Sequence, residues 1–169
     1  MQVNLRQIEE WDLPQLRDWR NGSSLRPTFR EYRLLNMVNQ RDWFEHISRS
    51  PKVEMFGIEY QDDLVGVCGL CSISWVNRSA EVSLYVQGYA VAGRALELLA
   101  EKAFEEFNLH RLWAEVYEFD AVKIAALKQM GFILEGKLRA AVFKKGKYYD
   151  SLMYGLLKEE QCSTDQSRS

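Results

Sequence analysis

The stretch "LYVQGYAVAGRALELL", residues 84–99, decides the fold of this chain. Its first residues complete the alternating segment 80–86, in which apolar and polar side chains point to opposite faces, as in a half-buried strand. Its later residues begin an apolar repeat of three and four that continues to residue 107 and predicts an amphipathic helix. A strand that turns directly into a helix exposes unpaired backbone N–H groups at the positive end of the helix dipole, which favours an anion. Small residues at such corners more often serve close packing, so both hypotheses remain open at this point.

Two common phosphate-binding loops do not fit this turn. The segment "QGYAVAGRA", residues 87–95, has no Lys followed by Ser or Thr, which an NTPase loop requires. It also lacks the three glycines of a dinucleotide-binding turn, and the predicted elements around it do not repeat as strand–helix–strand units. Neither of these protein classes is therefore predicted.

The remaining apolar patterns predict one α+β domain over residues 1–157. The helix over 89–107 joins two strands as a crossover, so strands 80–86 and 111–117 are predicted to be parallel within a mostly antiparallel sheet. About four helices flank this sheet. Residues 158–169 lack periodicity and are predicted to form a disordered polar tail. The other strands are predicted over 3–8, 54–60, 64–73, 132–143 and 147–157, and the other helices from Asp12, over 39–48 with Asn39 and Asp42 in capping positions, and from Asp120 to Met130.

Composition narrows the classes of function. The 169 residues suffice for one sizeable core, and a formal net charge of -2 argues against general nucleic-acid binding. No apolar run approaches the roughly 20 residues that span a bilayer, and the N-terminus does not resemble a signal peptide. We therefore expect a cytoplasmic protein with neither nucleic-acid nor membrane partners.

Cys68 and Cys71 form a CxxC pattern, which raises the question of a metal site. Residues three apart in a strand point to opposite faces, so the two thiols are not predicted to share a ligand. His46 and His110 have no ligand-like spacing around them. We therefore predict that Cys68 and Cys71 are ordinary apolar strand residues and that the protein has no metal site.

Several local sequences match one family. The turn 87–92 aligns with a Gln/Arg-x-x-Gly-x-Gly/Ala motif, and "NRSAEVSLYV" precedes it. Further matches are "ALELLAEKAFEEFNLHRLWAEVY", "ALKQMGFILEGKLR" and "FKKGKYYDSLMYGLL". Over residues 2–157 the chain thus resembles the GNAT superfamily of acyl-CoA N-acyltransferases. The nearest branches are those that acetylate ribosomal-protein N-termini, polyamines or amino-sugar nucleotides.

The resemblance implies acetyl-CoA as cosubstrate and no metal. In the family, the turn amides hold the cofactor pyrophosphate, and the splayed end of the preceding strand receives the pantetheine and polarises the thioester carbonyl. Asp120 aligns with the start of the family's last helix, where Asn is frequent. The resemblance therefore implies that Asp120 is one of the residues that bind the cofactor. The pantetheine would pair with the backbone at Leu84, Tyr85 and Val86. The pyrophosphate would contact Gln87, Gly88, Tyr89, Ala90, Val91, Ala92, Gly93 and the side chain of Arg94.

Direct acyl transfer needs a neutral amine, so a base must accept its proton. Glu81 is the candidate base, because it lies on the polar face of strand 80–86 and matches a Glu used in parts of the family. Alternatively, Glu81 is not catalytic and is either an exposed carboxylate of the strand or an ion-pair partner of Arg78. Tyr85 and Tyr117 are candidate acids for the leaving thiolate, and both would otherwise be packing aromatics.

The acceptor is expected to be a primary amine of a small molecule or of a protein N-terminus. Five arginines lie among aromatic residues between Trp19 and Trp43, a composition that suits a phosphorylated acceptor such as an amino-sugar nucleotide. A solvated surface loop explains the same composition. A homodimer formed through the final strands is left open.

Three features favour a second hypothesis, a GNAT-fold binding or scaffold protein with weak or lost catalysis. Ala90 replaces a family glycine and is tolerated only if this position is helical. Val86 leads directly to Gln87, where relatives commonly have about four more residues. Leu127 stands where many relatives carry a catalytic Tyr.

Overall fold

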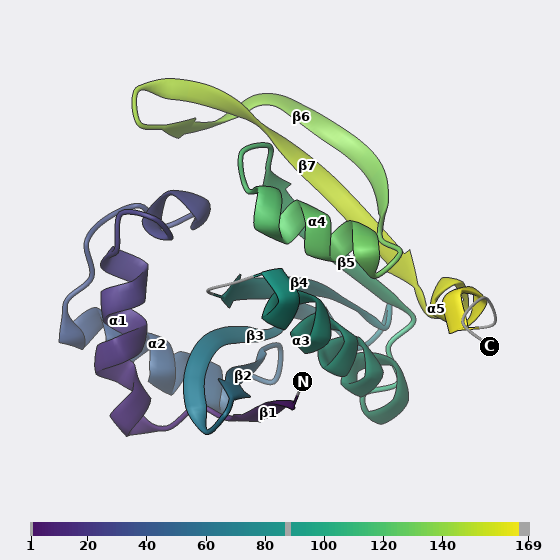
Figure 1. Ribbon diagram of the computed structural model, residues 1–169, viewed down its shortest axis with the longest axis horizontal. Helices are drawn as coiled ribbons and strands as arrows, with labels where there is room; N and C mark the ends of the chain where they lie inside the picture. The colour runs from purple at the N-terminus through teal and green to yellow at the C-terminus, as the bar shows by residue number, and fades with distance from the viewer. Residues whose placement is uncertain (1, 87–88, 166–169) are drawn as a thin grey trace.

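The order of strands and helices agrees with the prediction. The computed structural model describes residues 2–86 and 89–165, and Figure 1 shows their arrangement. The elements are β1 (Val3–Gln7), η1 (Glu10–Asp12), α1 (Leu13–Asn21), η2 (Arg26–Thr28), α2 (Met37–Arg49), β2 (Glu54–Tyr60), β3 (Asp63–Ser74), β4 (Ser79–Val86), α3 (Tyr89–Glu101), the π-helical turn η3 (Lys102–Glu106), β5 (Arg111–Tyr117), α4 (Ala121–Gln129), β6 (Ile133–Lys144), β7 (Lys147–Leu157) and α5 (Lys158–Asp165).

A seven-stranded sheet in the order β1-β2-β3-β4-β5-β7-β6 forms the centre of the protein. The pairs β1–β2, β2–β3, β3–β4, β5–β7 and β6–β7 are antiparallel, and β4–β5 is parallel, as the crossover helix predicted. The single α+β domain with a parallel β4–β5 pair is therefore confirmed.

Alternation along the strands divides the core between the two faces of the sheet. On β4, Leu84 belongs to the larger core cluster, which includes Leu96 of α3, whereas Tyr85 belongs to a second cluster with Leu16 of α1. Cys68 and Cys71 of β3 lie in these two clusters respectively, so they point to opposite faces as predicted. The helices α3 and α4 thus cover one face, and α1 and α2 cover the other.

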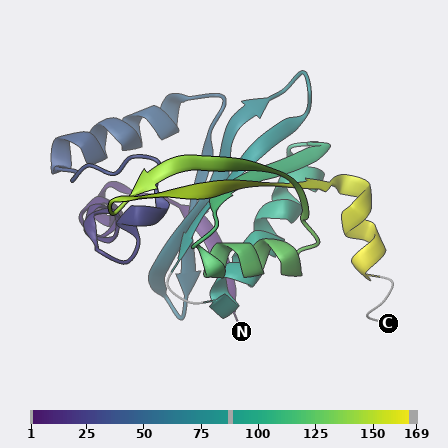
Figure 2. The ribbon, with the colours of Figure 1, turned by 90° about the horizontal axis from the view of Figure 1, so that it is seen from above.

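The two ends of the molecule have different elements. Figures 1 and 2 both place α1 and α2 at the end opposite α5, while the long β6–β7 hairpin reaches back toward the loop that follows α1. Lys144, near the tip of this hairpin, donates from Nζ to the carbonyl of Phe29 in that loop at 2.6 Å. This contact joins the N-terminal helical region to the C-terminal hairpin across the sheet.

Two predictions of local structure need correction. The cap of α2 is Asn36, not Asn39 or Asp42, because Asn36 and Asn39 exchange hydrogen bonds with each other's backbone N–H in a capping box. Residues 158–165 form α5 instead of a disordered tail; Glu160 accepts from the N–H of Leu157, and Lys158 Nζ donates to the carbonyl of Phe104. Side chains anchor the start of this helix, which a search for apolar periodicity does not detect. Over the described residues, no helix combines the length and apolar character needed to cross a bilayer.

Candidate active site

The strands β4 and β5 separate partway along their length. Their backbones pair only from Ser79–Arg111 to Glu81–Trp113, although β4 continues to Val86 and β5 to Tyr117. Beyond Glu81, β4 pairs with β3 alone, so its other edge keeps unpaired backbone groups. A cavity of about 250 Å³ lies at this separation, here called the central cavity, and its walls come from β4, β5, the start of α4 and the loop after α1.

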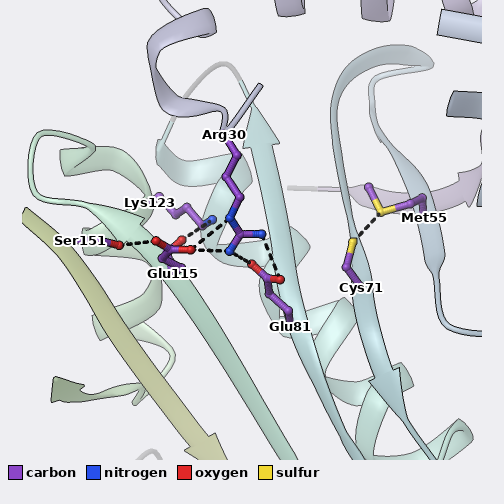
Figure 3. A network of polar contacts seen from close by, with 7 residues as sticks. All are labelled: Arg30, Met55, Cys71, Glu81, Glu115, Lys123 and Ser151. Atoms are coloured by element: carbon purple, nitrogen blue, oxygen red, sulfur yellow. Dashed lines mark hydrogen bonds and ion pairs between the residues drawn. The ribbon is translucent and has the colours of Figure 1, made fainter. Parts of the chain in front are cut away.

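Glu81 and Glu115 face each other across the central cavity. Glu81 comes from β4 and is only 7% exposed, and Glu115 comes from β5. Arg30 lies between them: Nη1 and Nη2 donate to Glu81 at 3.2 and 2.6 Å, and Nε donates to Glu115 at 3.0 Å (Figure 3). The two alternatives for Glu81, exposure and pairing with Arg78, are thus wrong; its partner is Arg30.

Further contacts hold Glu115 in its ionised form. Burial alone would raise its pKa, but hydrogen bonds from Ser151 and Arg30 outweigh burial and lower it. Lys123 of α4 donates from Nζ to the carbonyl of Glu115 at 3.2 Å (Figure 3), and burial lowers the pKa of this lysine. The basic side chains of Arg30 and Lys123 therefore lie beside the facing carboxylates of Glu81 and Glu115, and Arg30 is bound to both carboxylates.

The two candidate tyrosines occupy different places. Tyr117 lines the central cavity with Glu81, and its pKa is raised by burial and by Glu115, with Arg30 opposing. Tyr85 does not line this cavity but two flanking cavities, and its buried hydroxyl has no hydrogen-bond partner among the described residues. Geometry thus brings together Glu81 and Tyr117 and separates Tyr85 from them.

A second cavity, of about 300 Å³, extends along the free edge of β4. Leu84, Tyr85 and Val86 line it from the strand, and Asp120 lines it from the start of α4. The Asp120 carboxylate already accepts from the N–H of Lys123 at 3.1 Å, so it caps α4 as the sequence predicted. This second cavity shares Leu84, Asp120 and Lys123 with the central cavity.

The turn quoted at the outset leads into the start of α3. Gln87 and Gly88 lie outside the described residues, and α3 begins at Tyr89. Ala90 is therefore helical, which meets the condition under which alanine is tolerated there. Only the first four N–H groups of a helix lack partners inside it, so Gly93, its fifth residue, offers no free N–H for an anion. Gly93 is buried with its Cα facing Gln129 of α4, and Val91 and Ala92 lie in the core.

The remaining sequence-derived candidates are surface or core residues. Arg94 is exposed and pairs with Glu97 at 2.9 Å. Leu127 is fully buried in the core and lies away from the cavity residues. Among the described residues, no group of three His, Cys, Asp or Glu is placed to hold a metal ion.

Sequence reasoning missed Glu115 and Lys123, and it considered Arg30 only as one of the five arginines of the candidate acceptor region. Glu115 had a usable signal, since it alternates with Tyr117 on one face of a predicted strand. No local pattern links Arg30 to Glu81, because it lies in an irregular loop 51 residues before that glutamate. Lys123 is half-buried and its Nζ reaches the carbonyl of Glu115 on β5, a contact that no local pattern reports.

Comparison with known proteins agrees with this geometry. Residues 5–153 match the family described as acetyltransferase (GNAT) domain. The chain is 29% identical over 123 residues to a putative ribosomal N-acetyltransferase of Bacillus subtilis, covering 70% of this chain and 67% of that protein. It is 26% identical over 154 residues to spermidine N(1)-acetyltransferase of Escherichia coli K12, covering 89% and 83%.

A solved structure shows the same fold. Spermidine N-acetyltransferase from Vibrio cholerae, in complex with CoA and spermine, superposes with a TM-score of 0.88 at 23% identity, covering 95% of this chain and 98% of that chain. The split β4–β5 pair and these relatives define the class, an N-acetyltransferase that uses acetyl-CoA. The chain belongs to the GNAT acetyltransferase family.

Proposed function

We propose that this protein transfers acetyl from acetyl-CoA to a primary amine in the central cavity, by direct attack and with Glu81 as the base. The observation that carries the proposal is the cavity itself, which lies where β4 and β5 separate and is lined by a buried carboxylate beside unpaired strand backbone. An acyl carbonyl held by that backbone would lie within reach of an amine held by the carboxylate.

Acetyl-CoA would approach along the second cavity. Its pantetheine would pair with the free edge of β4 at Leu84, Tyr85 and Val86, next to Asp120. Its pyrophosphate would lie at the start of α3, on the backbone of Gln87 to Ala92, where the helix dipole favours negative charge. The proposal narrows the expected phosphate contacts, since Gly93 lies deeper in the helix.

Glu81 needs a free oxygen to accept a proton, and Arg30 now donates to both of its oxygens. The Arg30 side chain is 58% exposed and also contacts Glu115, so it can remain bound to Glu115 when an acceptor ammonium takes its place at Glu81. The ammonium loses one proton to Glu81, and its nitrogen attacks the thioester carbonyl. As the C–S bond breaks, the departing thiolate takes a proton from Tyr117, and the nitrogen releases its second proton to the Tyr117 phenolate, which leaves a neutral amide and CoA thiol.

Tyr117 suits the role of acid better than Tyr85. It shares the central cavity with Glu81, and its raised pKa keeps the phenol protonated at neutral pH. Tyr85 lines the flanking cavities only.

The acceptor belongs to the proposal as well. Relatives are named for spermidine and for ribosomal proteins, so a small-molecule amine, an amino-sugar nucleotide among them, and a protein N-terminus are the candidate acceptors.

The first test is binding of acetyl-CoA, measured by thermal unfolding. A ligand at 100 times its dissociation constant adds about 2.7 kcal/mol of stability, so millimolar acetyl-CoA should raise the melting temperature by several degrees. No shift at that concentration would exclude the proposed enzyme.

The second test separates an enzyme from a binding or scaffold protein. Thiol release with a panel of amines should fall by about 100-fold or more in Glu81→Gln, with unchanged affinity for acetyl-CoA. Glu45→Gln, on the exposed face of α2, is the matched control and should leave turnover unchanged. Binding of acetyl-CoA without turnover by the wild type on any amine would favour the scaffold hypothesis.

A further inference from the structure

A third cavity, of about 320 Å³, lies beneath α2 and shares Tyr85 as a lining residue with the second cavity. We call it the α2 cavity. It shares four lining residues with the central cavity, Arg20, Phe29, Cys71 and Ser83, so the two cavities are neighbours. Its other walls are mostly aromatic and apolar, with two polar residues, and come from Trp43, His46, Ile47, Val53, Met55, Ser72 and Tyr85.

Two residues that line this cavity each carry a buried side-chain atom for which the described part of the chain supplies no hydrogen-bond partner. These atoms are Nε of Arg20 and the hydroxyl of Tyr85. Tyr85 is only 6% exposed, and buried polar atoms of this kind normally have a partner in the protein, a water or a ligand. Both atoms can donate, which suits a ligand oxygen.

The charge around Arg20 is also uncompensated. The ion pairs of the described residues do not include Arg20, and no Asp or Glu lines the α2 cavity. The nearest acidic influence is Glu31, which is paired with Arg33. Burial lowers the pKa of Arg20, with Tyr85 and Glu31 opposing, as expected of a desolvated cation without a bound carboxylate.

Aromatic contacts fix the position of this cation. The Arg20 guanidinium carbon lies 4.4 Å from the ring centre of Phe29, and Phe29 packs edge-on against Tyr85 with ring centres 5.0 Å apart. A stacked guanidinium keeps its edge N–H groups for an oxyanion. Arg20 and Tyr85 thus form a preformed donor pair.

Together, the central and α2 cavities present opposite charges to one ligand. The carboxylate of Glu81 lies in the first, and the Arg20 cation lies in the second and borders the first. We propose that the acceptor amine also carries an oxyanion, a carboxylate or a phosphate, which Arg20 and Tyr85 bind in the α2 cavity while its amine reaches Glu81. This inference rests on the proposed acetyl transfer and names the class of acceptor. A polyamine would instead place a second ammonium beside Arg20, where like charges repel.

The test uses matched pairs of amines. For the carboxylate arm these are 4-aminobutyrate and butylamine; for the phosphate arm, phosphoethanolamine and ethanolamine; spermidine is added as a polyamine. Initial rates of thiol release give kcat and KM, and titration calorimetry with CoA present gives binding of each amine. Wild type should prefer the anionic member of at least one pair by about tenfold or more in kcat/KM.

Variants of two residues assign that preference to the cavity. Arg20→Met should raise KM for the anionic amine about tenfold or more and leave the neutral amine nearly unchanged, and Arg20→Lys should restore part of the difference. Tyr85→Phe should raise the same KM by a few fold, whereas loss of a general acid would lower kcat for every acceptor. Arg17→Met is the control, because Arg17 lies on the same helix and pairs with Asp18. Thermal unfolding checks that each variant is folded.

The inference fails if wild type uses or binds the members of both pairs equally, if spermidine is preferred, or if Arg20→Met weakens all amines alike. Acetyl transfer to neutral amines would then still support the proposed function. If no amine releases thiol, the proposed function fails, and calorimetry then tests the cavity assignment separately. Binding of an anionic amine that depends on Arg20 would support the assignment of the α2 cavity as an oxyanion site. Absence of such binding would overturn this assignment as well.

Discussion

Arg30 holds the charges of the candidate site together, because one guanidinium binds two facing carboxylates. Removing it would leave Glu81 and Glu115 to repel each other in a largely buried place. The stability lost on removing Arg30 is smaller than for a fully buried ion pair, because more than half of the Arg30 side chain is exposed.

We therefore expect Arg30→Met to lower the free energy of unfolding by about 1–2 kcal/mol at pH 7. The folded-state pKa of Glu115 is depressed, so its contribution is present above the ordinary carboxyl value of 4.5 and is lost as the pH falls below it through the folded-state pKa. The difference between variant and wild type should thus shrink between pH 5 and about pH 3, as measured by urea unfolding. Arg33→Met, in the same loop and paired only with Glu31 on the surface, is the control; equal losses in both variants would contradict the assignment.

Tyr117 gives a second prediction at this scale. If its phenol protonates the thiolate, Tyr117→Phe should lower kcat about tenfold or more without changing KM for acetyl-CoA. Burial and Glu115 raise its pKa above 10, so loss of this proton should not reduce wild-type kcat between pH 7 and 10. Tyr148→Phe, which alters a phenol that is 68% exposed on β7, should be silent in the same kinetic assay. An unchanged kcat in Tyr117→Phe would remove this residue from the mechanism.

At the scale of elements, α2 forms one wall of the α2 cavity, and its start depends on a capping box. The Asn36 side chain accepts from the N–H of Asn39, and the Asn39 side chain accepts from the N–H of Asn36. These contacts satisfy N–H groups that would otherwise lack partners at the helix start.

Replacing Asn36 by Ala should therefore destabilise the protein by about 1 kcal/mol in urea unfolding at neutral pH. Asn77→Ala, in the exposed turn between β3 and β4, is a matched substitution outside any helix start. A similar loss in Asn77→Ala, or none in Asn36→Ala, would show that the capping box does not stabilise α2.

At the scale of the whole molecule, β6 is an edge strand and carries an apolar surface. Four apolar side chains of β6 are each more than half exposed: Ile133, Leu134, Leu138 and Phe143. The homodimer left open by the sequence stays a prediction, and this edge is where it would form.

Sedimentation velocity tests that prediction. The wild type should sediment as a dimer at micromolar concentration, and Leu138→Glu should shift it to the monomer. Leu34→Glu changes an equally exposed leucine in the loop before α2 and should leave the dimer intact. A wild-type monomer at 100 µM would end the dimer hypothesis.

Sequence periodicity predicted most of the fold because alternation and the apolar repeat are local properties of strands and helices. The parallel β4–β5 pair followed from one crossover helix. The cap at Asn36 and helix α5 were missed, because side-chain hydrogen bonds fix both and neither alters the apolar pattern.

By itself, the sequence determined the order of elements, the α+β class, the family and the choice of Glu81 as the candidate base. All of these follow from local pattern or from motif spacing. Only the tertiary structure decided what surrounds Glu81. Arg30 and Glu115 lie 51 and 34 positions away along the chain, and folding alone brings their charges together in the cavity between the strands. The same holds for "LYVQGYAVAGRALELL": its pattern predicted the turn from strand to helix, but the start of α3 at Tyr89 makes Gly93 the fifth helical residue and restricts the candidate anion site to the first residues of α3.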